Sequence, residues 1–198
     1  MDGVSVDLIA GAVTALVGPS GSGKSSLLRI VAGLDRPDEG TVTVDGVNLT
    51  SLSAAGRRKL RRTKIGYVFQ RPSDNLIPYL TVMEHMQLAA KIRSADHGEA
   101  ADLLERLGIA HRAGNRPDQL SGGEQQRLAF GLAAIGQPPL MIADEPTAEL
   151  DSGSGQRLMQ LIASLAERGS AVVIATHDPE VAGVADRSVV LDEGRVVS

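Results

Sequence analysis

The sequence predicts an α/β fold, in which a mainly parallel β-sheet is covered by helices and carries an inserted helical segment. Three observations indicate this fold. Apolar runs typical of buried strands alternate with helix-forming stretches, an order that favours parallel strands and right-handed crossovers. A glycine-rich phosphate-binding motif lies between the first such strand and helix. The stretch from about residue 71 to 120 has helical patterns only.

The composition predicts a single packed domain of 198 residues, with a core of about 1–70 and 121–198 and a helical subdomain of about 71–120. Hydrophobic residues make up 42% and aromatic residues only 2%, so Leu, Val, Ile and Ala must fill the interior. The absence of cysteine excludes disulfides and thiolate metal sites. A net charge of −4 disfavours general binding to nucleic acid. We find no run long enough to span a bilayer and no signal-peptide pattern at the N-terminus.

The first third of the chain shows four strand or helix signals. Residues 4–8 alternate apolar and polar side chains, which predicts an edge strand. Residues 12–17 predict a buried strand, and residues 24–32 predict a helix that Gly33 ends. Residues 41–46 predict a strand that stops at an Asp-Gly turn.

The middle of the chain is mostly helical. Residues 57–64 hold six basic side chains, which we interpret as the solvated face of a helix. A short buried strand is expected at residues 65–69. Thr81 and Glu84 fit a capping box for a helix towards Arg93. A second helix, at residues 100–107, is expected to stop at Gly108. These patterns predict the inserted helical subdomain.

The last third returns to alternating elements. Apolar runs predict strands at residues 140–143, 171–175 and 188–191, and the segments between them predict helices at residues 124–134 and 152–168. This alternation predicts that the late strands join the early ones in one sheet.

Residues 18–25 read Gly-Pro-Ser-Gly-Ser-Gly-Lys-Ser, a complete phosphate-binding loop. The glycines allow the backbone angles with which successive N–H groups wrap a phosphate at a positive helix end. Lys24 is expected to reach the β- and γ-phosphates, and the Ser25 hydroxyl to bind Mg²⁺. An ordinary glycine- and serine-rich turn is the alternative, which the complete motif disfavours. The expected nucleotide-binding residues here are Gly18, Pro19, Ser20, Gly21, Ser22, Gly23, Lys24, Ser25 and Ser26.

A second glycine-rich segment, Leu-Ser-Gly-Gly-Glu, occupies residues 120–124. Ser121 and Glu124 fit a plain capping box, but a capping box does not explain Gly122 and Gly123 in the first helical turn, where glycine costs stability. Glycine there allows a ligand close to the backbone, and a helix N-terminus with a serine hydroxyl suits an anion. We expect this segment to close the other side of the phosphates, from a neighbouring subunit.

These motifs make the chain resemble the nucleotide-binding domain of ATP-binding cassette (ABC) proteins. The phosphate loop, residues 120–124 and the Leu-Met-Ile-Ala-Asp-Glu-Pro run at 140–146 occur in the family's order, and the match covers nearly all of the chain. Residues 33–37, 68–70 and 115–119 resemble the branch of lipoprotein release, macrolide-type efflux and the cell-division ATPase. The resemblance implies a P-loop NTPase, ABC-type ATPase core, in which a small antiparallel β part accompanies the mainly parallel sheet. It also implies ATP and Mg²⁺ as cofactors.

The resemblance also implies catalytic roles at the ends of two strands. Asp144 would hold Mg²⁺ through water, and Glu145 would act as the general base on the attacking water. His177 would contact the γ-phosphate and hold the water and Glu145 in place. The alternatives are a charged turn after a strand and a purely structural histidine. The expected catalytic residues are therefore Glu145 and His177.

Two further residues are assigned by resemblance. Gln70 would sense Mg²⁺ and relay its presence to a membrane partner, although an exposed glutamine is the alternative. The metal ligands would then be Ser25, Gln70 and Asp144. Asp151 matches the loop that crosses between subunits and is expected at the nucleotide. Its neighbour Glu149 is unusual for the family, which bears on communication between the two sites.

Our main hypothesis is the ATPase subunit of an ABC transporter or membrane-linked mechanical complex. It would form a head-to-tail homodimer when ATP binds and work with a separate transmembrane permease at the inner face of the cell membrane, in the cytoplasm. One alternative is a soluble family member acting on DNA or the ribosome, and another is a non-hydrolysing module that dimerises with ATP.

Family members carry an aromatic residue that stacks on adenine, and none precedes Gly18 here, so we expect loose base selectivity.

Overall fold

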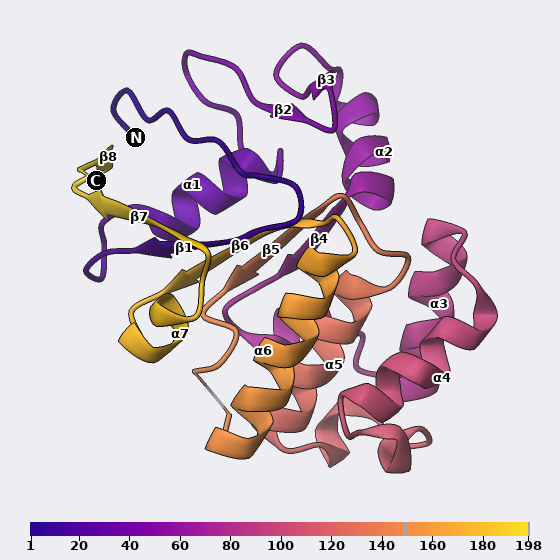
Figure 1. Ribbon diagram of the computed structural model, residues 1–198. Helices are drawn as coiled ribbons and strands as arrows, with labels where there is room; N and C mark the ends of the chain where they lie inside the picture. The colour runs from indigo at the N-terminus through magenta and orange to yellow at the C-terminus, as the bar shows by residue number, and fades with distance from the viewer. Residues whose placement is uncertain (149, 198) are drawn as a thin grey trace.

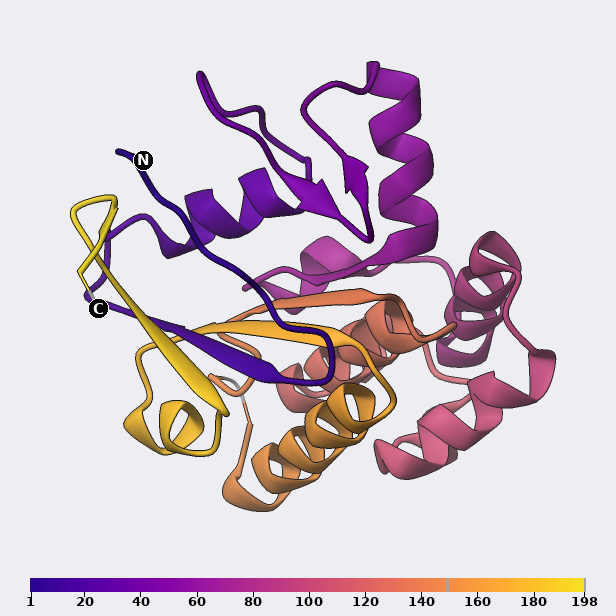
Figure 2. The ribbon, with the colours of Figure 1, turned by 45° about the horizontal axis from the view of Figure 1, so that its top comes forward.

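The computed structural model describes residues 1–148 and 150–197. A six-stranded sheet forms the middle layer, with helices against both of its faces (Figures 1 and 2). The strand order is β4–β5–β6–β1–β7–β8. The strands are β4 (Ile65–Val68), β5 (Leu140–Asp144), β6 (Ala171–Thr176), β1 (Val13–Val17), β7 (Arg187–Asp192) and β8 (Arg195–Val196). All neighbours are parallel except β7 and β8, which confirms the expected α/β fold with a mainly parallel sheet.

Seven α-helices and three short 3₁₀ helices are present in the described residues. The α-helices are α1 (Lys24–Val31), α2 (Ala54–Lys64), α3 (Val82–Arg93), α4 (His97–Arg106), α5 (Gly122–Ala134), α6 (Ser152–Glu167) and α7 (Pro179–Gly183). The 3₁₀ helices are η1 (Pro72–Asn75), η2 (Ala110–Arg112) and η3 (Pro117–Gln119). Helix α1 lies on one face of the sheet, while α5 and α6 lie on the other (Figure 2).

The alternating side chains of the strands feed two apolar cores. On β5, Leu140 and Ile142 join the core beneath α1 and α2, whereas Met141 and Ala143 join the core shared with α3 to α6. Phe130 of α5 is fully buried in this second core. Because the strands are buried on both faces, they read in the sequence as continuous apolar runs.

Local signals account for most helix boundaries. The Thr81–Glu84 capping box at the start of α3 is present in both directions, as predicted. Helix α4 begins earlier than residue 100, because the Asp96 side chain accepts a hydrogen bond from the Gly98 N–H (2.7 Å) and caps it. Helix α7 and strand β8 were not predicted, since each is very short.

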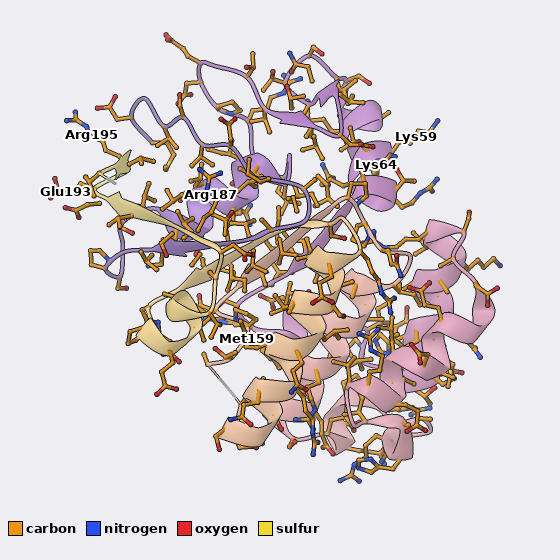
Figure 3. The ribbon with its side chains drawn as sticks, viewed as in Figure 1. Lys59, Lys64, Met159, Arg187, Glu193 and Arg195 are labelled. Atoms are coloured by element: carbon orange, nitrogen blue, oxygen red, sulfur yellow. The ribbon has the colours of Figure 1, made fainter. Side chains whose placement is uncertain are left out.

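The predicted turn at Asp45-Gly46 joins β2 (Thr43–Val44) to β3 (Val47–Asn48), a separate two-stranded sheet. Asp45 and Gly46 both have positive φ angles, 48° and 74°, which suit a tight hairpin. The basic face predicted at residues 57–64 lies on α2. Lys59 projects from that helix (Figure 3). Lys64 pairs with Asp45 at 2.8 Å. The exposed residues Arg58, Lys59 and Arg62 bear out the solvated helix face, whereas Arg61 is half-buried and donates to the Gly33 carbonyl.

The edge strand predicted at residues 4–8 is wrong, because this segment joins no sheet. No strand pairing of residues 4–8 is present in the described chain, although β2 and β3 form a two-stranded sheet whose outer edges carry no other strand. A groove of about 1040 Å³ borders the segment and residues 37–45. The N-terminus is tied instead to the β7–β8 turn, where Asp2 N–H donates to the Gly194 carbonyl at 2.9 Å. The alternation reflects Val4 and Leu8 packing on the core beneath α1.

Candidate nucleotide-binding and catalytic site

The predicted site residues follow the carboxyl ends of four neighbouring parallel strands. The register aligns these ends through the pairs Val68↔Ala143, Asp144↔Ala175 and Val17↔Thr176. The residues that continue beyond the strands are Gln70, Glu145, His177 and Gly18. Parallel α/β sheets bind their ligands at this edge.

The phosphate loop connects β1 to α1 in a conformation that needs glycine. Gly18 has φ +156°, and a Cβ there would lie 2.1 Å from the Leu191 carbonyl oxygen. Gly23, at the start of α1, has φ +102°. The Lys24 ammonium is buried and donates to the carbonyl oxygens of Gly18 (2.7 Å) and Pro19 (3.0 Å). Lys24 therefore holds the loop in shape from within, and its charge lies inside the loop.

Asp144 ends β5 as a buried carboxylate, only 5% exposed. Burial raises the pKa of Asp144, and the charge of Glu145 adds to this, while a polar contact with Ser25 and the charge of Lys24 act in the opposite direction. A carboxylate and a hydroxyl that meet beside a phosphate loop are oxygen donors of the kind that Mg²⁺ prefers. The residues present thus fit a magnesium ion held jointly with phosphates.

Glu145 and His177 form a pair across the ends of β5 and β6. The His177 Nδ1 lies 2.8 Å from a Glu145 carboxylate oxygen. The Glu145 side chain is 11% exposed and that of His177 is 73% exposed. Their hydrogen bond and the carboxylate charge raise the pKa of His177. The pair thus presents one face of the imidazole to solvent beside the phosphate loop.

The backbone of Glu145 is unusual for a non-glycine residue, with φ +49°. Its N–H donates to the Ala175 carbonyl at 2.9 Å, which continues the β5–β6 pairing by one residue. Such strained positions persist where the surrounding structure fixes them and occur often at functional sites. No local feature of the sequence predicted this conformation.

Gln70 is exposed beyond the end of β4, beside the edge that carries Asp144. Asp151 caps α6, where its carboxylate accepts hydrogen bonds from the Ser154 N–H (3.0 Å) and hydroxyl (2.7 Å). These bonds lower the pKa of Asp151. Glu149, singled out from the sequence, lies outside the described residues.

The second glycine-rich segment begins α5, with Gly122 and Gly123 as its first two residues. The Glu124 carboxylate accepts the Ser121 N–H (2.8 Å) and hydroxyl (3.0 Å), and the Glu124 N–H donates to the Ser121 hydroxyl oxygen (3.3 Å). This is the predicted capping box. It leaves Ser121 and Gly122 exposed at the helix start.

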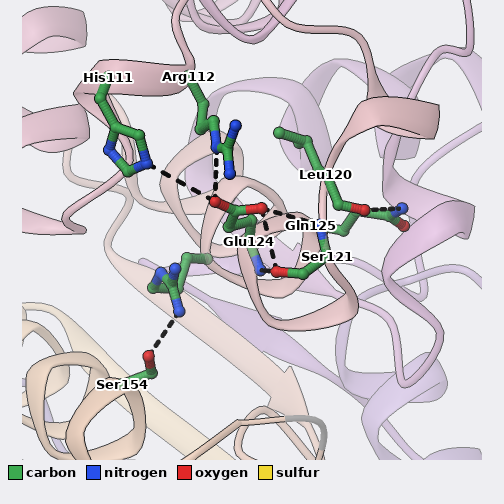
Figure 4. A network of polar contacts seen from close by, with 8 residues as sticks. His111, Arg112, Leu120, Ser121, Glu124, Gln125 and Ser154 are labelled. Carbon is green, nitrogen blue, oxygen red and sulfur yellow. Dashed lines mark hydrogen bonds and ion pairs between the residues drawn. The ribbon is translucent and has the colours of Figure 1, made fainter.

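Glu124 has additional partners that sequence reasoning missed. Arg112 of η2 donates to its other oxygen at 2.7 Å, and the His111 imidazole lies 3.7 Å from the same atom (Figure 4). Burial opposes ionisation, but the hydrogen bonds from Ser121 and Arg112 outweigh it and lower the pKa of Glu124 to about 2. Arg127 of α5 donates to Ser154 at 2.6 Å and so links α5 to the start of α6.

The structure thus brings together one part of the expected site within a single chain. The phosphate loop, Asp144, Glu145, His177 and Gln70 share one edge of the sheet. In the described residues, the hydrogen bonds of the Ser121 and Glu124 side chains are made within residues 112–124, apart from that edge.

The comparison with family models decides the family. The model described as "ABC transporter" matches residues 1–148. This chain belongs to the ABC transporter family. Within the described residues, no helix is long and apolar enough to cross a membrane.

Named relatives agree with the branch expected from the sequence. The chain is 41% identical to the lipoprotein-releasing system ATP-binding protein LolD of Shewanella frigidimarina, over 98% of this chain and 82% of LolD. It is 39% identical to the macrolide export ATP-binding/permease protein MacB of Shigella flexneri, over 100% of this chain but only 31% of MacB.

A solved structure shares the fold closely. It is described as the dimeric structure of a post-hydrolysis state of the ATP-binding cassette MJ0796 bound to ADP and Pi. The match has a TM-score of 0.90 at 38% identity and covers 98% of this chain and 86% of that one. A curated relative of the same name comes from Methanocaldococcus jannaschii. The ABC-type ATPase core expected from the sequence is confirmed.

Proposed function

We propose that this chain is the ATP-hydrolysing subunit of an ABC transporter that drives export or release, and that ATP binding joins two chains head to tail. The observation that carries this proposal is the Glu145–His177 pair, 2.8 Å apart at the edge that also holds the phosphate loop. A carboxylate there, oriented by an imidazole, is placed to act on a water molecule beside the terminal phosphate.

The phosphate loop would bind the ATP phosphates through its N–H groups at the start of α1. The Lys24 ammonium already donates to the carbonyls of Gly18 and Pro19 inside the loop. When ATP binds, it would donate to the β- and γ-phosphates instead. Ser25, Asp144 and Gln70 would hold Mg²⁺, which neutralises phosphate charge in such sites.

Glu145 would accept the proton of the attacking water. The bond to His177 would fix the carboxylate at the ends of β5 and β6. The exposed side of His177 would contact the γ-phosphate. Catalysis of this kind depends mainly on positioning and charge stabilisation, so the fixed geometry of the pair would contribute directly to the rate.

The second half of each site would come from the partner chain. Ser121 and Gly122 lie exposed at the N-terminus of α5, where N–H groups and the helix dipole favour an anion. Within one chain this segment bonds to residues outside the phosphate-loop edge, so it is free to meet the loop of a second chain. Asp151 would lie at the same subunit boundary. The dimeric state of the solved relative supports this assembly.

The helical subdomain at residues 71–120, together with Gln70, would pass the motion to a separate transmembrane permease. The chain would then lie in the cytoplasm, on the inner face of the membrane. The names of the relatives support a transporter, since LolD is an ATP-binding protein of a releasing system and MacB an ATP-binding/permease protein.

Mixed dimers test the shared site. A Lys24→Ala chain and a Ser121→Arg chain should each be inactive alone, because every site in either homodimer contains a defect. In the mixed dimer, one site pairs an intact loop with an intact Ser121. An equal mixture should therefore recover about a quarter of the wild-type rate of phosphate release. A mixture as inactive as its two components would contradict the site shared between chains.

A further inference from the structure

The Ser121 hydroxyl is committed within its own chain. A serine hydroxyl carries one proton, and this proton is donated to Glu124 Oε2 at 3.0 Å. The hydroxyl oxygen also accepts the Glu124 N–H at 3.3 Å. A phosphate oxygen can accept the Ser121 proton only if the hydroxyl turns away from Glu124.

If the hydroxyl turns away, the Glu124 carboxylate loses a hydrogen-bond donor. Its side chain is only 10% exposed, and it would lose one of its donors just as a negatively charged phosphate approaches. A buried carboxylate that loses a donor is costly, and like charges in a site of low dielectric constant repel strongly. The segment can bind phosphate tightly only if another group supports the carboxylate.

Arg112 is the nearer of two such groups, since the His111 imidazole lies 3.7 Å from Oε1. Arg112 donates through Nε to Glu124 Oε1 at 2.7 Å, the oxygen that the Ser121 hydroxyl does not use (Figure 4). The Ser121 N–H continues to hold Oε2 at 2.8 Å whatever the hydroxyl does. The carboxylate therefore keeps a cation and a backbone donor after the hydroxyl has left, and Arg112 screens its charge from the phosphate.

We propose that Arg112 is a positioning residue, which acts through Glu124 to release the Ser121 hydroxyl for the phosphate of an ATP bound to the partner chain. The inference rests on the proposed function and deepens it. Because Arg112 belongs to η2, in the connection between α4 and α5, it also makes the competence of this segment depend on the helical subdomain.

The test uses ATP-driven dimerisation in a Glu145→Gln background, where slow hydrolysis preserves the dimer. Sedimentation velocity across protein concentrations gives the dimer affinity with Mg-ATP. Adding Arg112→Ala should weaken dimerisation about tenfold or more, because this is the effect of losing one hydrogen bond to a charged group. Arg112→Lys should recover part of the affinity, because it keeps the charge but not the guanidinium geometry. Binding of a fluorescent ATP analogue to the monomer should not change.

Arg116→Ala is the matched control, since Arg116 is an exposed arginine of the same connection. It should leave the dimer affinity unchanged. Melting temperatures of all variants show whether any loss comes from unfolding instead.

A double-mutant cycle with Glu124→Gln separates positioning from a merely structural role. A neutral amide leaves no charge for Arg112 to support, so Arg112→Ala should cause little further loss in this background. An equal loss in both backgrounds would show that Arg112 acts independently of Glu124 and would overturn the inference. Dimers that Arg112→Ala leaves unweakened would overturn it too, without touching the proposed function. A Glu145→Gln parent that never dimerises with ATP would contradict both.

Discussion

Replacing Gly18 with alanine should destabilise the protein and damage the phosphate loop together. The new Cβ would lie 2.1 Å from the Leu191 carbonyl oxygen and 2.8 Å from the Ser22 hydroxyl oxygen. Favourable non-bonded separations are about 3.5–4.0 Å. The nearest atom belongs to the backbone of β7, so the overlap can be relieved only by moving that strand or the loop itself.

The cost follows from two terms. Overpacking of a rigid site costs about 1–3 kcal/mol, and a side chain at a positive φ adds about 1–2 kcal/mol. We therefore expect a loss of about 3 kcal/mol, which lowers the melting temperature of a chain this long by about 6–12 °C. ATP affinity should fall as well, because the displaced N–H groups no longer converge on a phosphate.

Substitutions at two other glycines separate the cost of overpacking from the cost of a positive φ, as measured by thermal and urea unfolding. Gly21→Ala changes the same loop at φ +82°, where no other described atom lies within 4 Å of the new Cβ, so it should cost only the conformational term. Gly155→Ala, in α6, has neither a positive φ nor a neighbour in the described chain within 4 Å, and should be stabilising by about 0.5–1 kcal/mol. If Gly18→Ala were no more destabilising than Gly21→Ala, the reasoning from steric overlap would be refuted.

Three further predictions concern the core and the site. Phe130→Ala should lower the free energy of unfolding by about 3–5 kcal/mol in urea titrations, whereas Tyr79→Ala, at a side chain 71% exposed, should change little. Burial raises the pKa of Asp144, so its charge destabilises the fold at high pH and this cost fades as the pH falls through the folded-state pKa. Asp144→Asn should therefore melt no lower than wild type at pH 7 yet lose Mg²⁺-dependent phosphate release; a lower melting temperature would contradict the sign. The bond to Glu145 raises the pKa of His177. The pair therefore stabilises the fold fully at pH values below the unfolded-state pKa of His177, and this stabilisation is lost as the pH rises through the folded-state pKa. An NMR titration should show a lower His177 pKa in Glu145→Gln, and an unchanged value would refute the pairing.

The fold was predictable where signals are local. The apolar run at 140–143 and the Thr81–Glu84 capping box each act over a few residues, and both predictions are confirmed. The edge strand at residues 4–8 failed because alternation shows only which side of a segment is apolar. Whether a strand forms depends on backbone pairing with another strand, which alternation does not show, and residues 4–8 join neither sheet.

The same distinction applies to the candidate site. The phosphate loop and Ser121–Glu124 are contiguous motifs, so their residues could be named from the sequence. Arg112 could not, because its bond to Glu124 spans twelve residues and arises only when η2 folds against the start of α5. The positive φ of Glu145 was equally hidden, since glutamate carries no preference for it.

Phosphate release from purified protein with Mg-ATP, measured across protein concentrations beside the Glu145→Gln variant, tests the central claim most directly. The rate per chain should rise with concentration, because both sites need two chains. The variant should bind ATP normally but turn over at least about a hundredfold more slowly, since general-base catalysis contributes about that much or more. Turnover that is unchanged in the variant, or a rate per chain that ignores concentration over a range where the protein passes from monomer to dimer, would contradict the account.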